Sequence, residues 1–383
     1  MSEIAEQFNF DILDERTRNH LVRSAVGATE VDITWWHSRE LAGAGLGSQV
    51  YRVSGEAQVD TTSEPWSLVI KTFAQTDGET SDDPPAWNYW KREWMAYQAA
   101  WLPTDGALVA PRCLGFGDRP ETGTWVALED LGTFDDQRPW SLARFGQVAS
   151  HLGEFQAPYL VARALPTAAW LSADWDAGWT DSAAEAVARL PMVIGHPLVR
   201  RVFSDAMVNE LQRLSDERGM LLSALGALPQ TLCHFDTFPR NLFVRSTDDG
   251  EQTVVIDWSY RGPGAVGEDL GGLVGLSLFW CEADPLKAAE LEAVCLDGFL
   301  AGLRRAGWQG DPRDVRLASL GREVLMVLGG VEPVIEVTMN ETLHPWLEAR
   351  SGVPMEKFVS NLATMLAFEE QNIQELWRLI TPR

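Results

Sequence analysis

The chain has 383 residues, of which 45% are hydrophobic and 22% are charged, so it can form a sizeable core in two domains or two lobes. Its formal net charge of -24 disfavours nucleic-acid binding as the main task, because phosphate neutralisation requires clustered Lys and Arg. The same acidity disfavours binding to anionic membrane surfaces.

The cysteines and the apolar segments bear on the cellular compartment. The four cysteines form no C-x-x-C pair, which is typical of reduced thiols in the cytoplasm. The first ten residues, MSEIAEQFNF, lack the apolar region of a signal peptide. The longest nearly apolar run, at 271–281, is too short to cross a bilayer. We therefore expect a cytoplasmic protein without a membrane segment.

The first third of the chain alternates strand-like and helix-like patterns. A helix is predicted first, then two strands that flank a glycine-rich stretch, a third β-branched strand, a second helix and two more strands. In chain order these elements are 10–26, 31–41, 48–55, 67–74, 86–102, 113–118 and 125–132, and the glycine-rich stretch is 42–48. After the first helix the order is β-β-β-α-β-β, and it ends near residue 131.

Helical patterns dominate the rest of the chain, and only residues 231–257 look extended. The helices are predicted at 140–157, 182–190, 198–225, 285–306, 313–330 and 355–379. We therefore predict an α+β protein with two lobes. Residues 1–131 form a small lobe of antiparallel sheet and helix, and residues 132–383 form a larger, mainly helical lobe.

The stretch LCHFDTFPRN at 232–241 gathers polar groups that can do chemistry. It places Asp236 and Asn241 five residues apart, and two short strand patterns with turn residues between them follow. If the strands pair as a hairpin, Asn241 faces Asp257 at a separation of roughly 5 Å. An amide oxygen and a carboxylate suit a hard cation such as Mg²⁺, which bridges phosphates. Asp236 then remains free to accept a proton.

Each of these residues also has a plainer interpretation. Asp236, Asn241 and Asp257 could be ordinary cap and turn residues. A zinc site made of Cys233, His234 and Asp236 is another alternative, but these ligands are crowded and lack a second pair at the usual spacing. For His234 we favour a structural role, in which it supports the loop through backbone hydrogen bonds.

The pattern H-x-D-x-x-x-x-N, followed by a hairpin and I-D-W, resembles the aminoglycoside phosphotransferase and choline kinase-like family. The resemblance implies a two-lobed protein-kinase-like fold. It also implies transfer of the γ-phosphate of ATP, with GTP as an alternative, to a hydroxyl of a small-molecule acceptor. Asp236 would be the catalytic base, and Asn241 and Asp257 would hold Mg²⁺.

Residues of the first lobe match the family's nucleotide-binding segments in order. The stretch ELAGAGLGSQVYRV resembles the loop over the phosphates, with Gly45, Gly47 and Ser48 as contacts. The stretch LVIK ends at Lys71, which would bind phosphates and pair with Glu93 on the following helix. A glycine hairpin without a ligand and a lysine that reaches water are the plainer alternatives.

The stretch ALEDLG resembles the hinge between the lobes, where Glu129 and Leu131 would offer backbone groups to adenine. Asp269 would brace the catalytic loop by accepting backbone N–H groups, with a helix N-cap as the alternative. Two positions depart from the common family pattern: Phe235 stands where glycine is frequent, and Ser259 stands where protein kinases have glycine.

The acceptor is less well indicated. Tryptophans and aspartates cluster in the segment AWLSADWDAGWTD, and they could form a cage for an amine or simply pack within the helical lobe. The residues concerned are Trp170, Trp175, Trp179, Asp174 and Asp176. We expect an aminoglycoside-like or other amine-bearing acceptor, while sugars and choline- or ethanolamine-type acceptors stay open. A pseudokinase interaction module is the alternative from another class, and the oligomeric state stays open.

Overall fold

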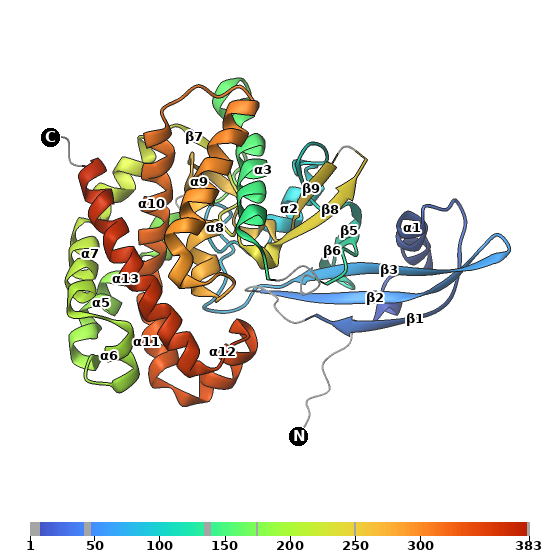
Figure 1. The fold of residues 1–383 in the computed structure, drawn as a ribbon. Coiled ribbons are helices and arrows are strands. Elements are labelled where there is room, and N and C mark those ends of the chain that lie inside the picture. Colours follow the sequence, from blue (N-terminus) through green and yellow to red (C-terminus); the bar gives the residue numbers. More distant parts are fainter. Residues whose placement is uncertain (1–7, 42–46, 134–138, 174, 249, 381–383) are drawn as a thin grey trace.

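The structure is a computed structural model that describes residues 8–41, 47–133, 139–173, 175–248 and 250–380. Figure 1 shows an extended sheet on one side of the molecule and a bundle of helices on the other. This arrangement confirms the predicted α+β class, with a sheet-containing part followed by a helical part. None of the helices in these ranges is long and apolar enough to cross a membrane.

The first lobe is built on a five-stranded antiparallel sheet of order β1-β2-β3-β6-β5. Its strands are β1 (Asp32–Glu40), β2 (Ser48–Val59), β3 (Thr62–Phe73), β5 (Cys113–Arg119) and β6 (Gly123–Glu129). Helix α1 (Glu15–Val26) packs on one face, where Leu21 belongs to the same buried cluster as Leu68 and Ile70 of β3. All five strands were predicted, because their period-2 patterns are local.

The second helix of this lobe is much shorter than its sequence pattern indicates. Helix α2 covers Arg92–Gln98, whereas the apolar spacing predicted 86–102. The residues before Arg92 form turns, and its guanidinium binds three of their carbonyls. A side chain that captures these carbonyls competes with the helix for them, so the first part of the prediction was wrong.

Two small sheets, separate from the five-stranded one, include the predicted hairpin. β8 (Leu242–Thr247) pairs with β9 (Gly250–Val255) as a hairpin, and β7 (Gln230–Cys233) pairs with β10 (Gly262–Ala265). A further strand, β4 (Leu108–Val109), pairs in parallel with β9. β4 was not predicted, because two residues carry no period and their partner lies far along the chain.

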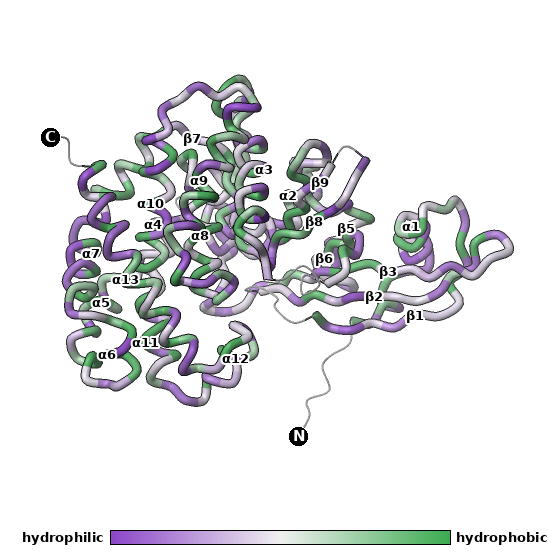
Figure 2. The backbone as a smooth tube through the Cα atoms, in the orientation of Figure 1, coloured by the Kyte–Doolittle hydropathy of each residue, from purple (hydrophilic) through white to green (hydrophobic). Residues whose placement is uncertain are grey.

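The second lobe is helical, as predicted. Its helices are α3 (Leu142–Val161), α4 (Trp175–Trp179), α5 (Ala183–Val193), α6 (Pro197–Val202), α7 (Asp205–Gly226), α8 (Glu268–Phe279), α9 (Ala288–Arg305), α10 (Pro312–Gly329), α11 (Val331–Met339), α12 (His344–Ser351) and α13 (Met355–Ile380). In Figure 2 the outer helices α5 and α7 carry both hydrophobic and hydrophilic residues, as expected for helices with one face on the core.

Two differences from the prediction in this lobe have local causes. The single helix predicted at 198–225 is divided into α6 and α7, because the hydroxyl of Ser204 accepts from the amide of Met207 and begins a new helix. Helix α8 was not predicted as a helix. Ten of its twelve residues are buried, so it has no polar face to produce the helical period.

Candidate active site

The predicted catalytic loop between β7 and β8 is held by the buried side chain of His234. Its Nε2 lies 3.0 Å from the carbonyl oxygen of Ile256, and its Nδ1 accepts from the amide of Asp236 at 3.2 Å. Burial lowers the pKa of His234 to about 4, so the ring is neutral with its proton on Nε2. These contacts are the backbone hydrogen bonds expected of a structural histidine.

Asp269 fastens the same loop from the first turn of α8. Its carboxylate accepts from the backbone amides of His234 at 2.8 Å and Phe235 at 2.7 Å, and from the Nε2 of Gln156 at 2.7 Å. The N-cap residue of α8 is Gly267. Asp269 therefore braces the loop, as predicted, and does not cap the helix.

Phe235 takes a backbone conformation that disfavours every residue except glycine. Its φ angle is 68°, in the left-handed region, which explains why this position favours glycine. The surroundings hold it there: the amide is bound by Asp269, and the carbonyl accepts from Arg322 at 2.7 Å. The ring stacks on Trp175 with 6.0 Å between centroids. Packing therefore offsets the backbone strain.

Asp236 and Asn241 are in direct contact. The Nδ2 of Asn241 donates to the Oδ2 of Asp236 at 2.7 Å and to its carbonyl oxygen at 2.9 Å. Burial, together with the charge of Asp257, raises the pKa of Asp236 to about 7. A carboxylate that titrates near neutral pH suits a general base.

The hairpin brings Asp257 close to Asn241, but in a different register from the prediction. The amide of Ile256 donates to the carbonyl of Asn241 at 2.9 Å, so Ile256 faces Asn241 and Asp257 lies one residue beyond. Asp257 has a φ angle of 61°, and this left-handed turn ends the strand. The predicted direct pairing of Asn241 with Asp257 was therefore wrong by one residue, although the hairpin itself is present.

Lys71 of β3 forms ion pairs with two carboxylates from other elements. Its Nζ lies 2.6 Å from Glu93 of α2 and 2.9 Å from Asp257. Burial opposes its charge, but Asp257 and Glu93 raise the pKa of Lys71 above its ordinary value. Asp257 has a lowered pKa despite burial, because Lys71 and the hydroxyl of Ser259 bind it. Lys71 is only 6% exposed, so it is not a surface lysine.

Two oxygen atoms at this point are suited to a hard cation. The Oδ1 of Asn241 and the Oδ2 of Asp257 accept no hydrogen bond from the described residues, because the other polar atom of each side chain makes the contacts. Amide and carboxylate oxygens are the donors that Mg²⁺ prefers. Within the described ranges, no group of three His, Cys, Asp or Glu is placed to hold a metal, and Cys233 is fully buried.

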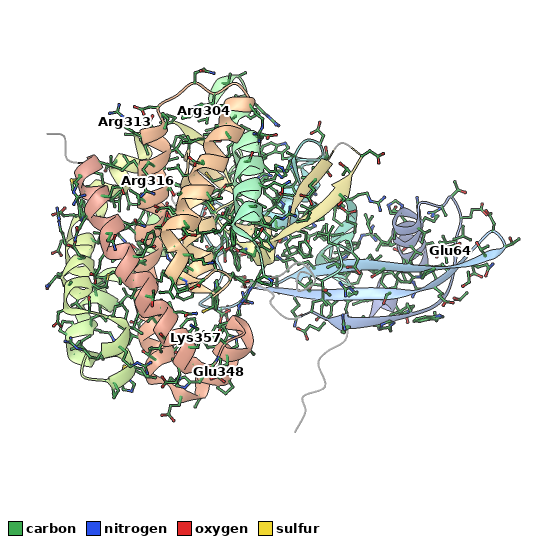
Figure 3. The ribbon with its side chains drawn as sticks, in the orientation of Figure 1. Glu64, Arg304, Arg313, Arg316, Glu348 and Lys357 are labelled. Carbon is green, nitrogen blue, oxygen red and sulfur yellow. The ribbon has the colours of Figure 1, made fainter. Side chains whose placement is uncertain are left out.

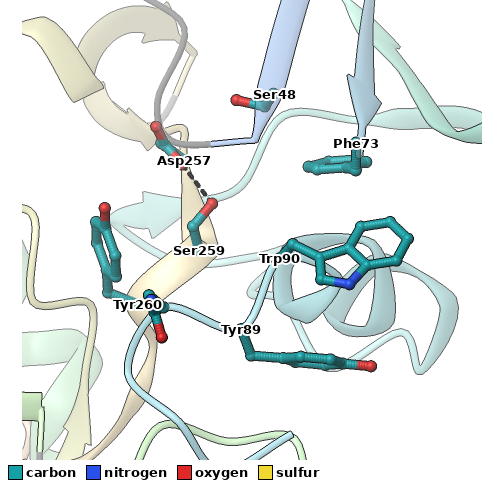
Figure 4. Close-up of a pocket in the computed structure, with 8 residues that line it drawn as sticks. Ser48, Phe73, Tyr89, Trp90, Asp257, Ser259 and Tyr260 are labelled. Atoms are coloured by element: carbon teal, nitrogen blue, oxygen red, sulfur yellow. Dashed lines mark hydrogen bonds between the residues drawn. The ribbon is translucent and has the colours of Figure 1, made fainter. Parts of the chain in front are cut away.

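The glycine-rich stretch is only partly described. Gly45 lies outside the described residues. Gly47 has a φ angle of 67°, and a Cβ atom there would lie 2.5 Å from the carbonyl oxygen of Ala74, so this close turn requires glycine. Ser48 lines a recess together with Phe73, Asn88, Tyr89, Trp90, Asp257, Ser259 and Tyr260, most of which are labelled in Figure 4.

The predicted hinge residues are partly committed to other contacts. The amide of Glu129 donates to the carbonyl of Arg112 at 2.9 Å, so that N–H group already has a partner. Leu131 is half-buried against a small cluster of Val109, Phe243 and Val254. Between them, Asp130 forms an ion pair of 2.7 Å with Arg52, which fixes the hinge to β2.

Arg92 is a structural residue that the sequence interpretation missed. It is fully buried, and its Nε donates to the carbonyl of Trp170 at 2.7 Å. Its Nη1 donates to the carbonyls of Trp87 at 2.9 Å and Ser259 at 2.8 Å. The side chain thus ties α2 to the segment after Asp257 and to the helical lobe. Its position beside Glu93, within an apolar helix pattern, is the signal that could have identified it.

The tryptophan-rich segment differs from the expected amine cage. Asp174 lies outside the described residues. Asp176 is buried and forms an ion pair with Arg322, whose guanidinium lies 3.7 Å from the ring centroid of Trp175. Trp170 packs on Trp101, with 5.4 Å between centroids. The protein itself supplies the cation of this cluster, so Asp176 is not a free carboxylate for an acceptor.

The chain is similar to known phosphotransferases. A model of the phosphotransferase enzyme family matches residues 123–311, which include the hinge, the catalytic loop and the hairpin. A microcompartment-associated aminopropanol kinase is 17% identical with a TM-score of 0.50, and the match covers 91% of this chain and 96% of that one. The search of curated proteins finds no match.

Two further solved structures are similar over most of their length. A choline kinase from Cryptosporidium parvum Iowa II is 14% identical with a TM-score of 0.48, covering 90% of this chain and 91% of that one. An aminoglycoside phosphotransferase from Alicyclobacillus acidocaldarius is 13% identical with a TM-score of 0.48, covering 94% and 96%. Residues 123–311 thus match the phosphotransferase enzyme family, and the chain is a small-molecule kinase with the protein-kinase-like fold.

Proposed function

We propose that the chain transfers the γ-phosphate of ATP to a hydroxyl group of a small molecule, with Asp236 as the catalytic base. The observation that carries this proposal is that two contacting pairs of polar side chains lie next to each other. Lys71 contacts Asp257, and Asn241 contacts Asp236, while the hairpin joins Asn241 to Asp257. Phosphoryl transfer depends mainly on positioning and charge neutralisation, which this arrangement supplies.

Each residue has a role that follows from its contacts. Asp236 accepts the proton of the attacking hydroxyl. Asn241 orients the carboxylate of Asp236 by donating a hydrogen bond to its Oδ2. Lys71, whose charge is maintained by Glu93, binds phosphate oxygens of the nucleotide. Mg²⁺, when bound, would neutralise phosphate charge and would be held by the Oδ1 of Asn241 and the Oδ2 of Asp257.

The remaining nucleotide contacts are proposed from the family resemblance. Gly45, Gly47 and Ser48 would lie over the phosphates, and Leu131 would offer its amide to adenine. Because the amide of Glu129 is already bound, only its carbonyl remains for the base. GTP is an alternative nucleotide. We further propose a boundary between the lobes after residue 131, a cytoplasmic location, and no nucleic-acid or membrane partner.

Substitution of the base and of the metal ligand tests the proposal. In a coupled assay of ATP consumption with a panel of hydroxylated amines, acids and sugars, Asp236→Asn should abolish transfer and keep nucleotide binding. Asp257→Ala should remove the Mg²⁺ dependence of nucleotide affinity. Asp118→Asn, which alters a carboxylate bound to Lys91 in the sheet lobe, serves as the control. Turnover of Asp236→Asn within about tenfold of wild type would refute the assignment.

The competing proposal is a nucleotide-binding module without catalysis. Intact Lys71, Asp236, Asn241 and Asp257 favour catalysis, and the assay separates the two, since a module would bind nucleotide without consuming it. Aminoglycoside-like compounds, choline- or ethanolamine-type alcohols and sugars all remain candidate acceptors. Asp176 no longer supports the expectation of an amine on the acceptor, because Arg322 already binds that carboxylate.

A further inference from the structure

The end of helix α12 is fastened to the catalytic loop beside Asp236. Arg240, which precedes Asn241, donates from its Nη2 to the backbone carbonyl of Arg350. The two guanidinium groups also share one aromatic ring, because Arg240 lies 5.4 Å and Arg350 5.2 Å from the centroid of Trp280. Figure 1 shows α12 at the edge of the helical lobe that faces strands β1, β2 and β3. Arg350 therefore lies beside the loop that carries Asp236 and Asn241.

The two arginines differ in how their charges are balanced. Arg240 forms an ion pair of 2.7 Å with Glu282. Arg350 forms no ion pair with any residue in the described ranges, and it is half-buried against Trp280. Stacking on a tryptophan fixes the plane of a guanidinium, while its donors along the edge stay available. In Figure 3, Glu348 and Lys357 mark the same end of the helical lobe.

The charges around the base also point to an anion. The negative charge that raises the pKa of Asp236 is that of Asp257, which pairs with Lys71 on the nucleotide side. The cations that act on Asp236 are Arg322 and Arg350, and both oppose the rise of its pKa. Arg322 is already bound to Asp176, so Arg350 is the cation of these two whose guanidinium pairs with no carboxylate of the described residues. An amine next to Asp236 would meet this positive charge, whereas an anion would be attracted to it.

We propose that Arg350 binds an anionic group, a carboxylate or a phosphate, on the acceptor whose hydroxyl Asp236 activates. This inference rests on the proposed function and names the acceptor class. A planar guanidinium binds either anion through two parallel hydrogen bonds. Trp346 stands one helical turn before Arg350 on α12 and is 57% exposed, so it offers an apolar face to the carbon skeleton. The net charge of -24 repels anions at long range, so this selectivity is local.

The test uses acceptors that differ in one group. Glycerol, glycerate and glycerol 3-phosphate share a hydroxylated skeleton, and ethanolamine and serine differ only by a carboxylate. For each compound, kcat/KM is measured with ATP and Mg²⁺. Its dissociation constant is measured with a non-hydrolysable ATP analogue, so that binding without turnover also counts. Wild type should favour the anionic member of a set by about tenfold or more.

The variants then assign that preference to Arg350. Arg350→Gln should weaken the binding of the anionic compounds, and lower their kcat/KM, by about tenfold to a hundredfold. The values for the uncharged compounds should stay within about twofold of wild type. Arg350→Lys should restore part of the preference, because it keeps the charge and loses the fork. Arg213→Gln is the matched control, since Arg213 lies 4.4 Å from the ring centroid of Trp377, on helices α7 and α13.

Each other outcome has a definite meaning. A wild-type preference for the uncharged or cationic members would overturn the inference, as would an unchanged preference in Arg350→Gln. If Arg350→Gln slows transfer to all acceptors equally and also slows ATP hydrolysis without an acceptor, Arg350 serves the transferred phosphoryl group and the inference is wrong. Failure of the proposed function differs from these results, because no acceptor would then be phosphorylated although anions could still bind.

Discussion

The ammonium of Lys71 and the carboxylate of Asp257 form an ion pair of 2.9 Å between residues that lie 186 positions apart. Lys71→Met should leave Glu93 and Asp257 buried without a cation. Removing one partner of a buried pair costs about 3–5 kcal/mol of the free energy of unfolding. Urea denaturation measures this loss, and nucleotide titration should show weaker binding.

Lys91→Met provides the matched control for Lys71. Lys91 is partly exposed and pairs with Asp118 at 3.0 Å, so its loss should cost less than about 1 kcal/mol. Equal losses of stability in the two lysine variants would show that the pairing of Lys71 is not special.

Because of Asp236, kcat/KM for the acceptor should fall as pH is lowered through neutral pH. Burial and the charge of Asp257 raise its pKa to about 7. A base must be deprotonated to accept a proton, so kcat/KM for the acceptor should rise about tenfold from pH 6 to pH 8 and then level off. A pH-rate profile that is flat over this range would contradict the assignment of Asp236.

The raised pKa of Asp236 makes the stability of the fold fall with rising pH, whereas the activity should rise. The folded state holds the proton of Asp236 more tightly than the unfolded state, so stability falls as pH rises from about 4 towards 7. Asp236→Asn should therefore be more stable than wild type at pH 8, by roughly 1–3 kcal/mol, although we expect it to be inactive. Thermal or urea denaturation at pH 5 and pH 8 measures the difference, which should shrink at the lower pH.

Arg92 should act as a positioning residue for the segment after Asp257, which we propose as a metal ligand. Arg92→Lys keeps the charge but cannot reach the carbonyls of Trp87, Trp170 and Ser259 together, so buried carbonyls lose their donors. We expect a loss of about 2–4 kcal/mol and a weaker Mg²⁺ dependence of nucleotide affinity. Arg39→Lys, at an exposed position of β1, is the control. If the Mg²⁺ dependence of nucleotide affinity is the same as in wild type, Arg92 contributes to stability alone.

The sequence predicted what short-range patterns encode. The alternating strands and the hairpin after Asn241 were found, because period and turn residues are local. The register was missed by one residue, because the left-handed conformation of Asp257 leaves no mark on the strand pattern. The contacts of Arg92 with Trp170 and Ser259, and the pairing of Asp176 with Arg322, were also missed. Each joins residues more than 70 positions apart, and no local pattern encodes such contacts.

Phe235, which stands where glycine is frequent, should stabilise the fold because its packing outweighs its backbone strain. Phe235→Gly would relieve the left-handed strain of about 1 kcal/mol, but it would remove a ring packed on Trp175 and leave a cavity. Loss of a buried aromatic ring costs about 3–5 kcal/mol, so the variant should be less stable by roughly 2–4 kcal/mol. A variant more stable than wild type would mean that strain outweighs packing at this position.

A group of buried carboxylates in the helical lobe should make stability depend on pH. The Nδ2 of Asn372 lies 3.2 Å from an oxygen of Glu292 and 3.3 Å from oxygens of Glu323 and Glu369. Arg316 is bound to Glu292 and Glu375, each at 2.8 Å. Burial, and then the charge of Glu292, raises the pKa of Glu369 to about 8. Glu369 therefore keeps its proton in the folded state well above the pH at which it ionises in the unfolded chain.

The consequence can be isolated with Glu369→Gln, which imitates the protonated side chain. Wild-type stability from this group is complete below about pH 4.5 and falls as pH rises towards about 8. The variant should match wild type near pH 4.5 and be more stable at pH 8, by roughly 2–4 kcal/mol.

Glu375→Gln, on the same helix, should behave oppositely, because its hydrogen bond to Arg316 lowers the pKa of Glu375. Its loss at pH 8 should stay below about 1 kcal/mol, since the side chain is 40% exposed. Urea denaturation of both variants at pH 5, 6.5 and 8 makes the comparison. Glu375 is charged in the folded state at these pH values, so relief of the overall charge of -24 would stabilise Glu375→Gln. A loss of stability in this variant can therefore come only from the lost contact with Arg316.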